Sequence, residues 1–320
     1  MEKVSVIIPN YNGMSYLKTC LNSIKNQTFL EYSVILVDNG SSDGSVNLVR
    51  NEYSWVKLID LPKNYGFCHA VNEGIRISKT PYVIFLNNDT EVFPDFVEQL
   101  LKGIEERPTA FSCSSMMIQD QERSKVDDAG NFYNAFGWGF ARGKGKDISK
   151  YDKPSRIFAA CAGAAIYRRE YLNQMGLLDE EYFAYLEDLD LGYQAWIIGY
   201  ENWYLPKAKV YHVGSGTSGS RYNELKIRYS ARNSVYLIHK NMPLFQRILN
   251  LPFLLIGFFI KILFFTVKGY GKEYISGIKN GFFISYKKEN YEKKVRFRWG
   301  NLGHYCRIQI ALWINLFRRF

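Results

Sequence analysis

Short apolar runs alternate with helix-length segments through the first hundred residues of the chain. Runs rich in Val and Ile, each ended by turn residues, occupy residues 4–8, 34–37, 56–61 and 82–86. Runs of this kind are typical of strands buried in a parallel sheet. Helix-length segments follow them at residues 15–26, 45–51, 66–78 and 94–106. The order βαβαβαβα predicts an α/β fold with a mostly parallel sheet.

Polar loops follow the first three predicted strands, at residues 9–13, 38–45 and 64–67. Ligands of such sheets bind at the carboxyl ends of the strands, so these loops are expected to share one edge. They contain neither a G-x-G-x-x-G fingerprint nor a P-loop, which disfavours dinucleotide cofactors and ATP. Each loop taken singly is also an ordinary turn, with Ser42 or Asp43 as a helix cap. Together, the three loops predict a ligand pocket.

The fourth predicted strand ends in Asn87, Asn88 and Asp89. Carboxylate and amide oxygens suit Mg²⁺ or Mn²⁺, which takes the rest of its ligand shell from water and substrate phosphates. The alternative is that these residues cap the helix predicted at residues 94–106.

Six motifs, in order along residues 4 to about 233, resemble those of family 2 glycosyltransferases with the GT-A fold. The similarity is to the branch that includes bacterial rhamnosyltransferases of cell-surface polysaccharide assembly. The motifs are V-S-V-I-I-P-N-Y-N-G from Val4, V-I-L-V-D-N-G-S-S-D-G-S from Val34, N-Y-G-F-C-H-A-V-N-E-G from Asn64, F-L-N-N-D-T from Phe85, Y-F-A-Y-L-E-D-L-D-L-G-Y from Tyr182 and V-Y-H from Val210. The resemblance implies a Rossmann-like nucleotide-diphospho-sugar transferase fold.

The resemblance also implies a donor-binding set: Pro9, Tyr11, Asn12, Asp38, Asn64, Gly66, Phe67, Asn87 and Asn88. Within it, Asp38 would accept a hydrogen bond from the N3–H of a pyrimidine base, and Gly66 would permit close backbone approach. Asp89 would bind Mg²⁺ or Mn²⁺ on the diphosphate together with His212, which lies on a short strand predicted at residues 209–213. Many family members have Asp-x-Asp where this chain has Asn87, Asn88 and Asp89, so one negative charge fewer faces the cation.

Three carboxylates, Glu187, Asp188 and Asp190, open a predicted helix through Ile198. Acidic residues in a first turn also complement the helix dipole, which is the simpler interpretation. Carboxylates this close disfavour one another's ionisation, which raises a pKa toward that of a general base. By resemblance, Asp188 is the catalytic base, and Glu187 and Asp190 support its position. The implied reaction is a single displacement with inversion.

Residues 130–151 are rich in Gly and aromatic side chains and predict a long irregular segment. Such segments are usually functional, and these aromatics are expected to form a sugar-stacking acceptor wall. A buried core loop is the alternative.

Positive charge is concentrated at the C-terminal end of the chain. Residues 221–320 hold 19 Lys and Arg against 4 Asp and Glu, while residues 1–220 hold 22 against 27. The basic residues alternate with Phe, Tyr, Leu and Ile, a pattern that favours an anionic membrane surface over nucleic acid. The five cysteines are far apart without a C-x-x-C pair, so neither disulfides nor a zinc site is expected.

An apolar stretch at residues 244–267 either spans a membrane while tolerating Lys261 or lies in the interface, with Arg247, Lys261 and Lys268 reaching the headgroups. We expect the interfacial arrangement, joined by a second apolar stretch at residues 308–317. Packing on the catalytic domain, or on a second copy of the chain as a homo-oligomer, is the alternative. The expected domains are residues 1–235, the GT-A glycosyltransferase, and residues 236–320, a basic, helical, membrane-associating region.

The apolar run at residues 4–8 is too short for the hydrophobic region of a secretory signal, and Pro9 and Asn10 follow it directly. The chain is therefore expected on the cytoplasmic face of the cell membrane, as a peripheral or monotopic protein. The predicted activity is metal-dependent, inverting transfer from dTDP-rhamnose or a UDP-sugar to a hydroxyl of a lipid-linked or oligosaccharide acceptor. The rival hypothesis is a non-catalytic protein that binds nucleotide-sugars or glycans at the membrane.

Overall fold

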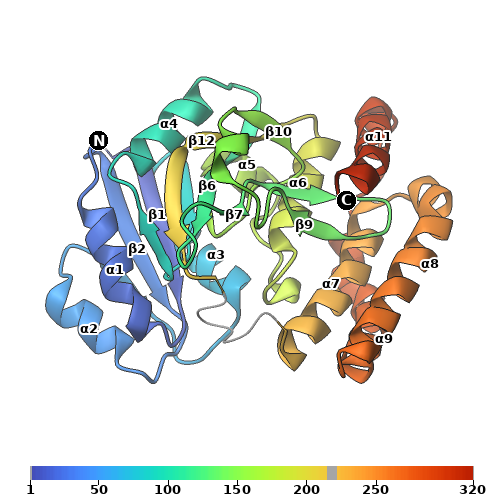
Figure 1. The fold of residues 1–320 in the computed structure, drawn as a ribbon, viewed down its shortest axis with the longest axis horizontal. Helices are drawn as coiled ribbons and strands as arrows, with labels where there is room; N and C mark the ends of the chain where they lie inside the picture. The colour runs from blue at the N-terminus through green and yellow to red at the C-terminus, as the bar shows by residue number, and fades with distance from the viewer. Residues whose placement is uncertain (1, 215–221, 320) are drawn as a thin grey trace. The chain divides into compact units, whose positions relative to one another are not determined.

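The computed structural model describes residues 2–214 and 222–319, which form two compact units (Figure 1). Unit 1 comprises residues 2–131, 141–183 and 201–214 of this part of the chain, and unit 2 comprises residues 132–140, 184–200 and 222–319. Each unit thus joins segments that are far apart in sequence. The division into independent domains at residue 235 stays a prediction.

Unit 1 is built on a mixed, mostly parallel sheet of order β10-β12-β6-β11-β4-β1-β2-β3, with β5 beside β12 and β7 beside β6. The pairs β1–β2, β1–β4, β2–β3 and β6–β12 are parallel. The strands β5, β7, β10 and β11 run antiparallel to their neighbours. The bounds are β1 Val4–Asn10, β2 Tyr32–Asp38, β3 Lys57–Asp60, β4 Tyr82–Leu86, β5 Thr90–Val92, β6 Ala110–Gln119, β7 Val126–Asp128, β10 Ser155–Ile157, β11 Ala164–Arg168 and β12 Glu201–His212.

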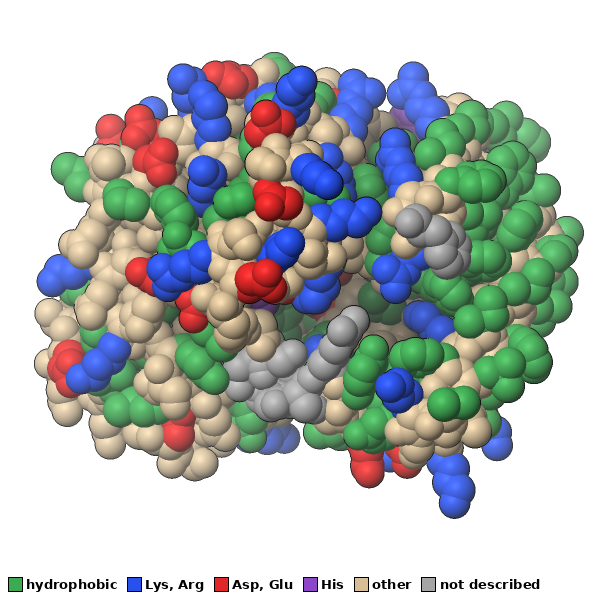
Figure 2. Space-filling view, viewed as in Figure 1, with side chains coloured by type: hydrophobic (Ala, Val, Ile, Leu, Met, Phe, Trp, Pro, Cys, Tyr) green, Lys and Arg blue, Asp and Glu red, His purple; other side chains and the backbone are tan. Residues whose placement is uncertain are grey.

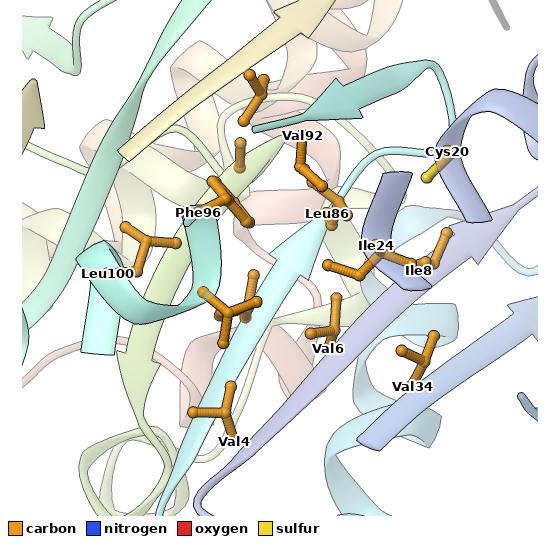
Figure 3. Packing of buried hydrophobic residues seen from close by; sticks show 14 of the residues in the cluster. Val4, Val6, Ile8, Cys20, Ile24, Val34, Leu86, Val92, Phe96 and Leu100 are labelled. Atoms are coloured by element: carbon orange, nitrogen blue, oxygen red, sulfur yellow. The ribbon is translucent and has the colours of Figure 1, made fainter. Parts of the chain in front are cut away.

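Helices cover both faces of this sheet. They are α1 Met14–Lys25, α2 Ser45–Glu52, α3 Phe67–Ile77, α4 Phe96–Glu105 and α5 Arg169–Gln174, with 3₁₀ turns η1 Ile148–Tyr151 and η2 Glu180–Tyr182. Val6 and Ile8 of β1 point into a buried cluster with Ile24 of α1 and Phe96 of α4 (Figure 3). Ile7, between them, faces α3, where a Cβ on Gly74 would lie 2.5 Å from its side chain. Side chains alternate between faces because a strand repeats every two residues.

The predicted α/β architecture is confirmed, with the four predicted strands observed as β1 to β4 and the four helices as α1 to α4. Two details differ. The strand predicted at residues 56–61 was expected to be buried, but β3 is the edge strand beyond β2 and Lys57 and Asp60 are exposed. The short strand predicted at residues 209–213 is the C-terminal part of β12, which begins at Glu201 because its N-terminal half also pairs with β6.

Residues 130–151 are more regular than predicted. They contain β8 (Asn131–Tyr133) and β9 (Gly139–Ala141), which pair with each other. Within unit 2, Tyr133 is fully buried, and the indole N–H of Trp138 donates to the carbonyl of Gly257 at 3.2 Å. Tyr133 lies in the core of unit 2 and Trp138 is half-buried against α8, so the alternative of a buried core segment fits these two side chains better than an acceptor wall.

Unit 2 is otherwise helical. Its helices are α6 Glu187–Ile197, α7 Glu224–Asn241, α8 Leu244–Val267, α9 Gly271–Ser285, α10 Lys288–Glu292 and α11 Leu302–Arg318, with the 3₁₀ turn η3 Trp299–Asn301. Gly277 of α9 lets that helix approach α7, because a Cβ there would lie 2.5 Å from the carbonyl oxygen of Arg228. Asn250 of α8 and Gln309 of α11 exchange two buried hydrogen bonds of 2.8 Å. Packing and polar pairing thus both fix the helices to one another.

The outer side of α8 is apolar and exposed. Figure 2 shows hydrophobic side chains gathered over the region where Figure 1 labels α8. Leu244, Ile248 and Leu255 are each more than three-fifths exposed. Among the described residues, α8 is the one helix long and apolar enough to cross a membrane, at 24 residues. The apolar stretch predicted at residues 244–267 is therefore a single helix with an unpartnered face.

Candidate active site

A buried polar network lies where β1, β2 and β4 end in unit 1. Asn10, at the end of β1, donates through Nδ2 to Asp38 Oδ1 at 2.6 Å and accepts through Oδ1 from Asn88 Nδ2 at 2.6 Å. Asp38 also accepts from the backbone N–H of Ser41 at 2.8 Å and from its hydroxyl at 2.7 Å. The register of the parallel strands brings these residues together, since Asn10 and Asp38 are direct partners across β1 and β2. The predicted shared edge therefore exists.

The loops after β1 and β2 are joined to each other. The backbone N–H of Asn12 donates to Ser41 Oγ at 2.8 Å, and Asn12 Oδ1 accepts from the backbone N–H of Ser42 at 2.9 Å. Asn12 adopts a positive φ of 50°, a conformation that Asn tolerates better than most residues. Pro9 is half-buried and Tyr11 is exposed, so both border this edge without entering the network.

Asp43 has a structural role at helix starts, which was the alternative that the sequence allowed for it. Its carboxylate accepts from the backbone N–H groups of Met14 and Ser45, the first residues of α1 and α2. Its pKa is lowered, because these hydrogen bonds and that of the Ser45 hydroxyl outweigh the opposing effect of burial. Asp43 thus fixes two helix starts.

The loop after β3 is held by Asn39. Its Nδ2 donates to Asn64 Oδ1 and to the carbonyl of Gly66, both at 3.0 Å. Gly66 has a φ of 93°, and a Cβ there would lie 2.6 Å from the ring of Phe183. Both constraints require glycine at this position. Phe67 follows as the first residue of α3, so the third predicted loop joins the same edge.

Asp89 and His212 meet as the resemblance implies. Asp89 Oδ1 lies 3.3 Å from His212 Nε2, and His212 Nδ1 lies 2.8 Å from Asp127 Oδ2. Burial by itself would lower the pKa of His212, but hydrogen bonds to Asp127 and Asp89 raise it to about 9. Burial would likewise raise the pKa of Asp127, which the bond from His212 and the charge of Lys144 instead lower to about 2. The imidazole is therefore held as a cation between two carboxylates.

A divalent cation fits this arrangement only in part. No group of three His, Cys, Asp or Glu side chains is disposed around a cation position in residues 2–214 and 222–319. Asp89 and His212 would supply two ligand atoms at most, and a cation of the Mg²⁺ type takes its remaining ligands from water and phosphate. Asp127 would then hold the Nδ1–H of a neutral His212 and leave Nε2 for the metal. Asn87 is half-buried next to this pair, with its backbone N–H bonded to the Gly163 carbonyl at 2.8 Å.

The carboxylates of α6 lie in unit 2 and differ sharply in environment. Asp190 is 1% exposed and accepts from Lys240 Nζ at 2.7 Å and from Asn241 Nδ2 at 2.6 Å. Glu187 is 8% exposed, and its Oε2 is buried without a partner among the described residues. Burial raises the pKa of Glu187 to about 8, with the charges of Asp188 and Asp190 adding to the effect. Asp188 is half-buried, which makes it the most accessible carboxylate of the three.

The turn that precedes α6 is strained. Phe183, Tyr185 and Leu186 all have positive φ values, between 62° and 74°. Such backbone costs on the order of 1–3 kcal/mol per residue and persists where the surroundings enforce it. Asn233 of α7, fully buried, donates to the carbonyls of Ala184 and Tyr185 at 2.9 and 2.7 Å. This side chain helps to fix the position of the first turn of α6.

Sequence reasoning missed four residues of these networks: Asp127, Asn233, Lys240 and Asn241. A signal existed for the last three, since their spacing of seven and eight residues places them on one face of α7. Asp127 carried no such signal, because it reaches His212 from β7 through the fold.

The comparisons with known proteins agree with this geometry. Residues 5–176 match the description Glycosyl transferase family 2. The chain belongs to this family. Family 2 glycosyltransferases are inverting.

Two curated relatives illustrate the range of matches to this glycosyltransferase. It is 27% identical over 241 residues to the N-acetylglucosaminyl-diphospho-decaprenol L-rhamnosyltransferase of Mycobacterium tuberculosis, covering 68% of this chain and 78% of that one. It is 36% identical over 103 residues to an uncharacterized glycosyltransferase of Escherichia coli, covering 31% of this chain and 30% of that one. The chain thus spans less than a third of some relatives that it matches.

Solved structures show the same fold. GalNAc-T7, crystallised with UDP, GalNAc and Mn²⁺, superposes with a TM-score of 0.60 at 18% identity, covering 75% of this chain and 48% of that one. TarS of S. aureus, residues 1–349, superposes with a TM-score of 0.54 at 18% identity, covering 99% and 85%. The predicted GT-A fold is therefore confirmed.

Proposed function

We propose that this glycosyltransferase moves a sugar, with inversion, from a pyrimidine nucleotide-diphospho-sugar to a hydroxyl of a growing, lipid-linked cell-surface glycan. The observation that carries the proposal is the edge of unit 1 where the Asn10–Asp38–Asn88 network ends beside the Asp89–His212 pair. A nucleotide-sugar needs polar contacts for its base and a cation for its diphosphate. The rhamnosyltransferase relative supports dTDP-rhamnose as the donor, with a UDP-sugar as the alternative.

Asp38 would recognise the base. Its Oδ1 already accepts two hydrogen bonds, whereas Oδ2 accepts one, from the backbone of Ser41. A carboxylate oxygen has two acceptor positions, so Oδ2 retains one for the N3–H of uracil or thymine. Asp38 is completely buried here, so a base reaches it only if the loop that follows β2 shifts on binding. Pro9, Tyr11, Asn12, Asn64 and Phe67 would form the walls around the nucleotide.

Asp89 and His212 would hold Mg²⁺ or Mn²⁺ on the diphosphate, with Asn87 and Asn88 beside them. When bound, such a cation would offset the negative charge of the leaving diphosphate, as divalent cations do in phosphate chemistry. Asp89→Asn is then expected to weaken donor binding in the presence of Mn²⁺ more than in its absence.

Asp188 would act as the general base. It would take the proton of the acceptor hydroxyl while that oxygen forms a bond to the anomeric carbon, and the bond from that carbon to the diphosphate breaks on the opposite face. The electron pair of the broken bond leaves with the diphosphate. Glu187 and Asp190 keep the first turn of α6 in place rather than touch the acceptor.

The deciding experiment compares the wild type with Asp188→Asn and, as a matched control, Asp179→Asn, whose carboxylate caps η2. Donors are first found by thermal shift with UDP-, dTDP- and GDP-sugars, with and without Mn²⁺. We expect Asp188→Asn to keep donor binding and to lose transfer by about 10²–10⁴-fold. Near wild-type turnover would show that the base assignment is wrong. Donor binding without any transfer by the wild type, across lipid-linked acceptors, would support the non-catalytic alternative.

The apolar face of α8 would hold the enzyme on the cytoplasmic leaflet, where a lipid-linked acceptor lies. Ile248→Glu with Leu255→Glu places charge on that face at exposed positions, so the fold should tolerate both changes. These variants should no longer float with anionic liposomes. Flotation unchanged by them would favour packing on a second copy of the chain. Deleting residues 240–320 is a poorer test, because it also removes Lys240 and Asn241, two of the partners of Asp190.

A further inference from the structure

Three basic side chains of unit 2 lie close enough for their charges to act on one another. They are His239 near the end of α7, Arg247 in the first turn of α8 and Lys294 after α10. The backbone N–H of Val295 donates to the carbonyl of Lys240 at 2.9 Å, which fixes the segment around Lys294 against the end of α7. The ring of Tyr286 packs edge-on against His239, with centroids 5.0 Å apart. Residues from three separate segments therefore meet at one place.

Two side-chain nitrogens of this cluster are buried and unpartnered among the described residues. His239 is 7% exposed, and its Nε2 has no hydrogen-bond partner in the described part of the chain. The Nε of Arg247 is also buried and has no hydrogen-bond partner among the described residues. Buried polar groups of native proteins are nearly always hydrogen-bonded, because leaving one unpaired costs about 1–3 kcal/mol. Two such nitrogens at one place could both be satisfied by a single polar ligand.

The charges at this place are of one sign. Burial, then the positive charges of Lys294 and Arg247, lower the pKa of His239 to about 4. The charge of Arg247 also lowers the pKa of Lys294, after burial. Lys240, the residue after His239, is already paired with Asp190. Within residues 222–319, no ion pair joins Glu289 or Glu292 of α10 to His239, Arg247 or Lys294. A bound anion would relieve the repulsion and accept a hydrogen bond from Arg247 Nε, and from His239 Nε2 in the tautomer that carries its proton there.

We propose that His239, Arg247 and Lys294 form a binding site for the phosphate group of an anionic lipid. A guanidinium, an ammonium and an imidazole offer the charge-assisted donors that phosphate oxygens accept. The choice of a lipid over free phosphate rests on the membrane attachment proposed above. Leu244, Ile248 and Leu251, which flank Arg247 on α8, are all at least half exposed, so acyl chains have an apolar surface within one turn of the phosphate.

The test uses the full chain with vesicles of phosphatidylcholine, with and without phosphatidylglycerol. Arg247→Gln and Lys294→Gln each remove one cationic donor, and Lys279→Gln on the exposed surface of α9 is the matched control. Each of the two site variants should bind the anionic vesicles about tenfold more weakly than the control, the effect of one charge-assisted hydrogen bond. Binding to pure phosphatidylcholine should be the same for all variants.

The outcomes separate this site from membrane attachment itself. If Ile248→Glu abolishes vesicle binding while both site variants bind like the control, the apolar face attaches the protein but the phosphate site is wrong. If inorganic phosphate stabilises the wild type in thermal shift, and Arg247→Gln removes that effect without weakening vesicle binding, the site takes free phosphate and the lipid assignment is overturned. If Arg247→Gln fails to fold, Lys294→Gln still tests the site, because Lys294 lies outside the helices.

Discussion

Lys240 of α7 and Asp190 of α6 form a buried ion pair, with Nζ 2.7 Å from Oδ2 and side chains only 6% and 1% exposed. Asn241 and Gln194 donate to the same carboxylate. The third carboxylate of the E-D-x-D motif is therefore neutralised by the helix that precedes the apolar tail. Since α6 also carries the proposed base, the helical C-terminal region helps to hold that helix in place.

Lys240→Met should destabilise the protein by about 3–5 kcal/mol, because it leaves the Asp190 carboxylate buried without its cation. Urea unfolding monitored by tryptophan fluorescence measures the change. Lys279→Met is the control, since a surface substitution usually stays within about 0.5 kcal/mol. Equal stability of the two variants would mean that Asp190 finds compensation in Asn241 and Gln194 alone.

Asp38→Ala should weaken binding of UDP and dTDP by tenfold or more, since it removes the acceptor for the base and one hydrogen-bond partner of Asn10. Calorimetry with UDP, dTDP and GDP measures it. Asp38→Asn separates the two effects, because the amide preserves the shape of the network but offers a donor. Tighter binding of GDP than of both pyrimidine nucleotides by the wild type would contradict the assignment.

Much of unit 1 could be predicted from the sequence, because strand burial and turn chemistry are local properties. The apolar runs predicted strands β1 to β4, and the polar residues at their ends predicted a shared edge. At that edge the register of β1 and β2 places Asn10 beside Asp38. The hairpin at residues 131–141 escaped prediction because its Gly and aromatic residues also suit an irregular segment. Its aromatics pack against α8, more than a hundred residues later.

The site was harder to predict where partners come from distant elements. The pairing of His212 with Asp127 spans 85 residues, and that of Lys240 with Asp190 spans 50. Neither pair follows from spacing, because the fold alone decides which buried charges meet. The burial of Asp38 was equally invisible, since a polar loop residue is usually exposed.

Gly13→Ala should damage the donor edge without straining the backbone. Its φ of −102° suits alanine, but a Cβ would clash with Asn88 Nδ2 and Asn10 Oδ1, the two atoms that form the 2.6 Å hydrogen bond. Loss of that bond should cost about 1–3 kcal/mol in stability and weaken UDP binding. Gly300→Ala, where an added Cβ meets no atom within 4 Å, is the control. Two variants with equal thermal midpoints and equal UDP affinity would show that the Asn10–Asn88 bond is dispensable.

Glu187 makes the stability of the enzyme depend on pH in a defined window. Its pKa rises from 4.5 to about 8 on folding, so between these values the folded state holds a proton that the unfolded state has lost. Stability should therefore fall as the pH rises through this window, by about 1.4 kcal/mol per pH unit for one proton, and level off above it.

Glu187→Gln removes the proton uptake. The free energy of unfolding of this variant, relative to that of the wild type, should therefore grow from pH 5 to about pH 8. Urea unfolding at a series of pH values measures both curves, with Glu105→Gln on the exposed side of α4 as the control for losing a surface carboxylate. Parallel curves for wild type and Glu187→Gln would mean that Glu187 is already ionised in the folded enzyme, held by a cation or by a rearranged first turn of α6.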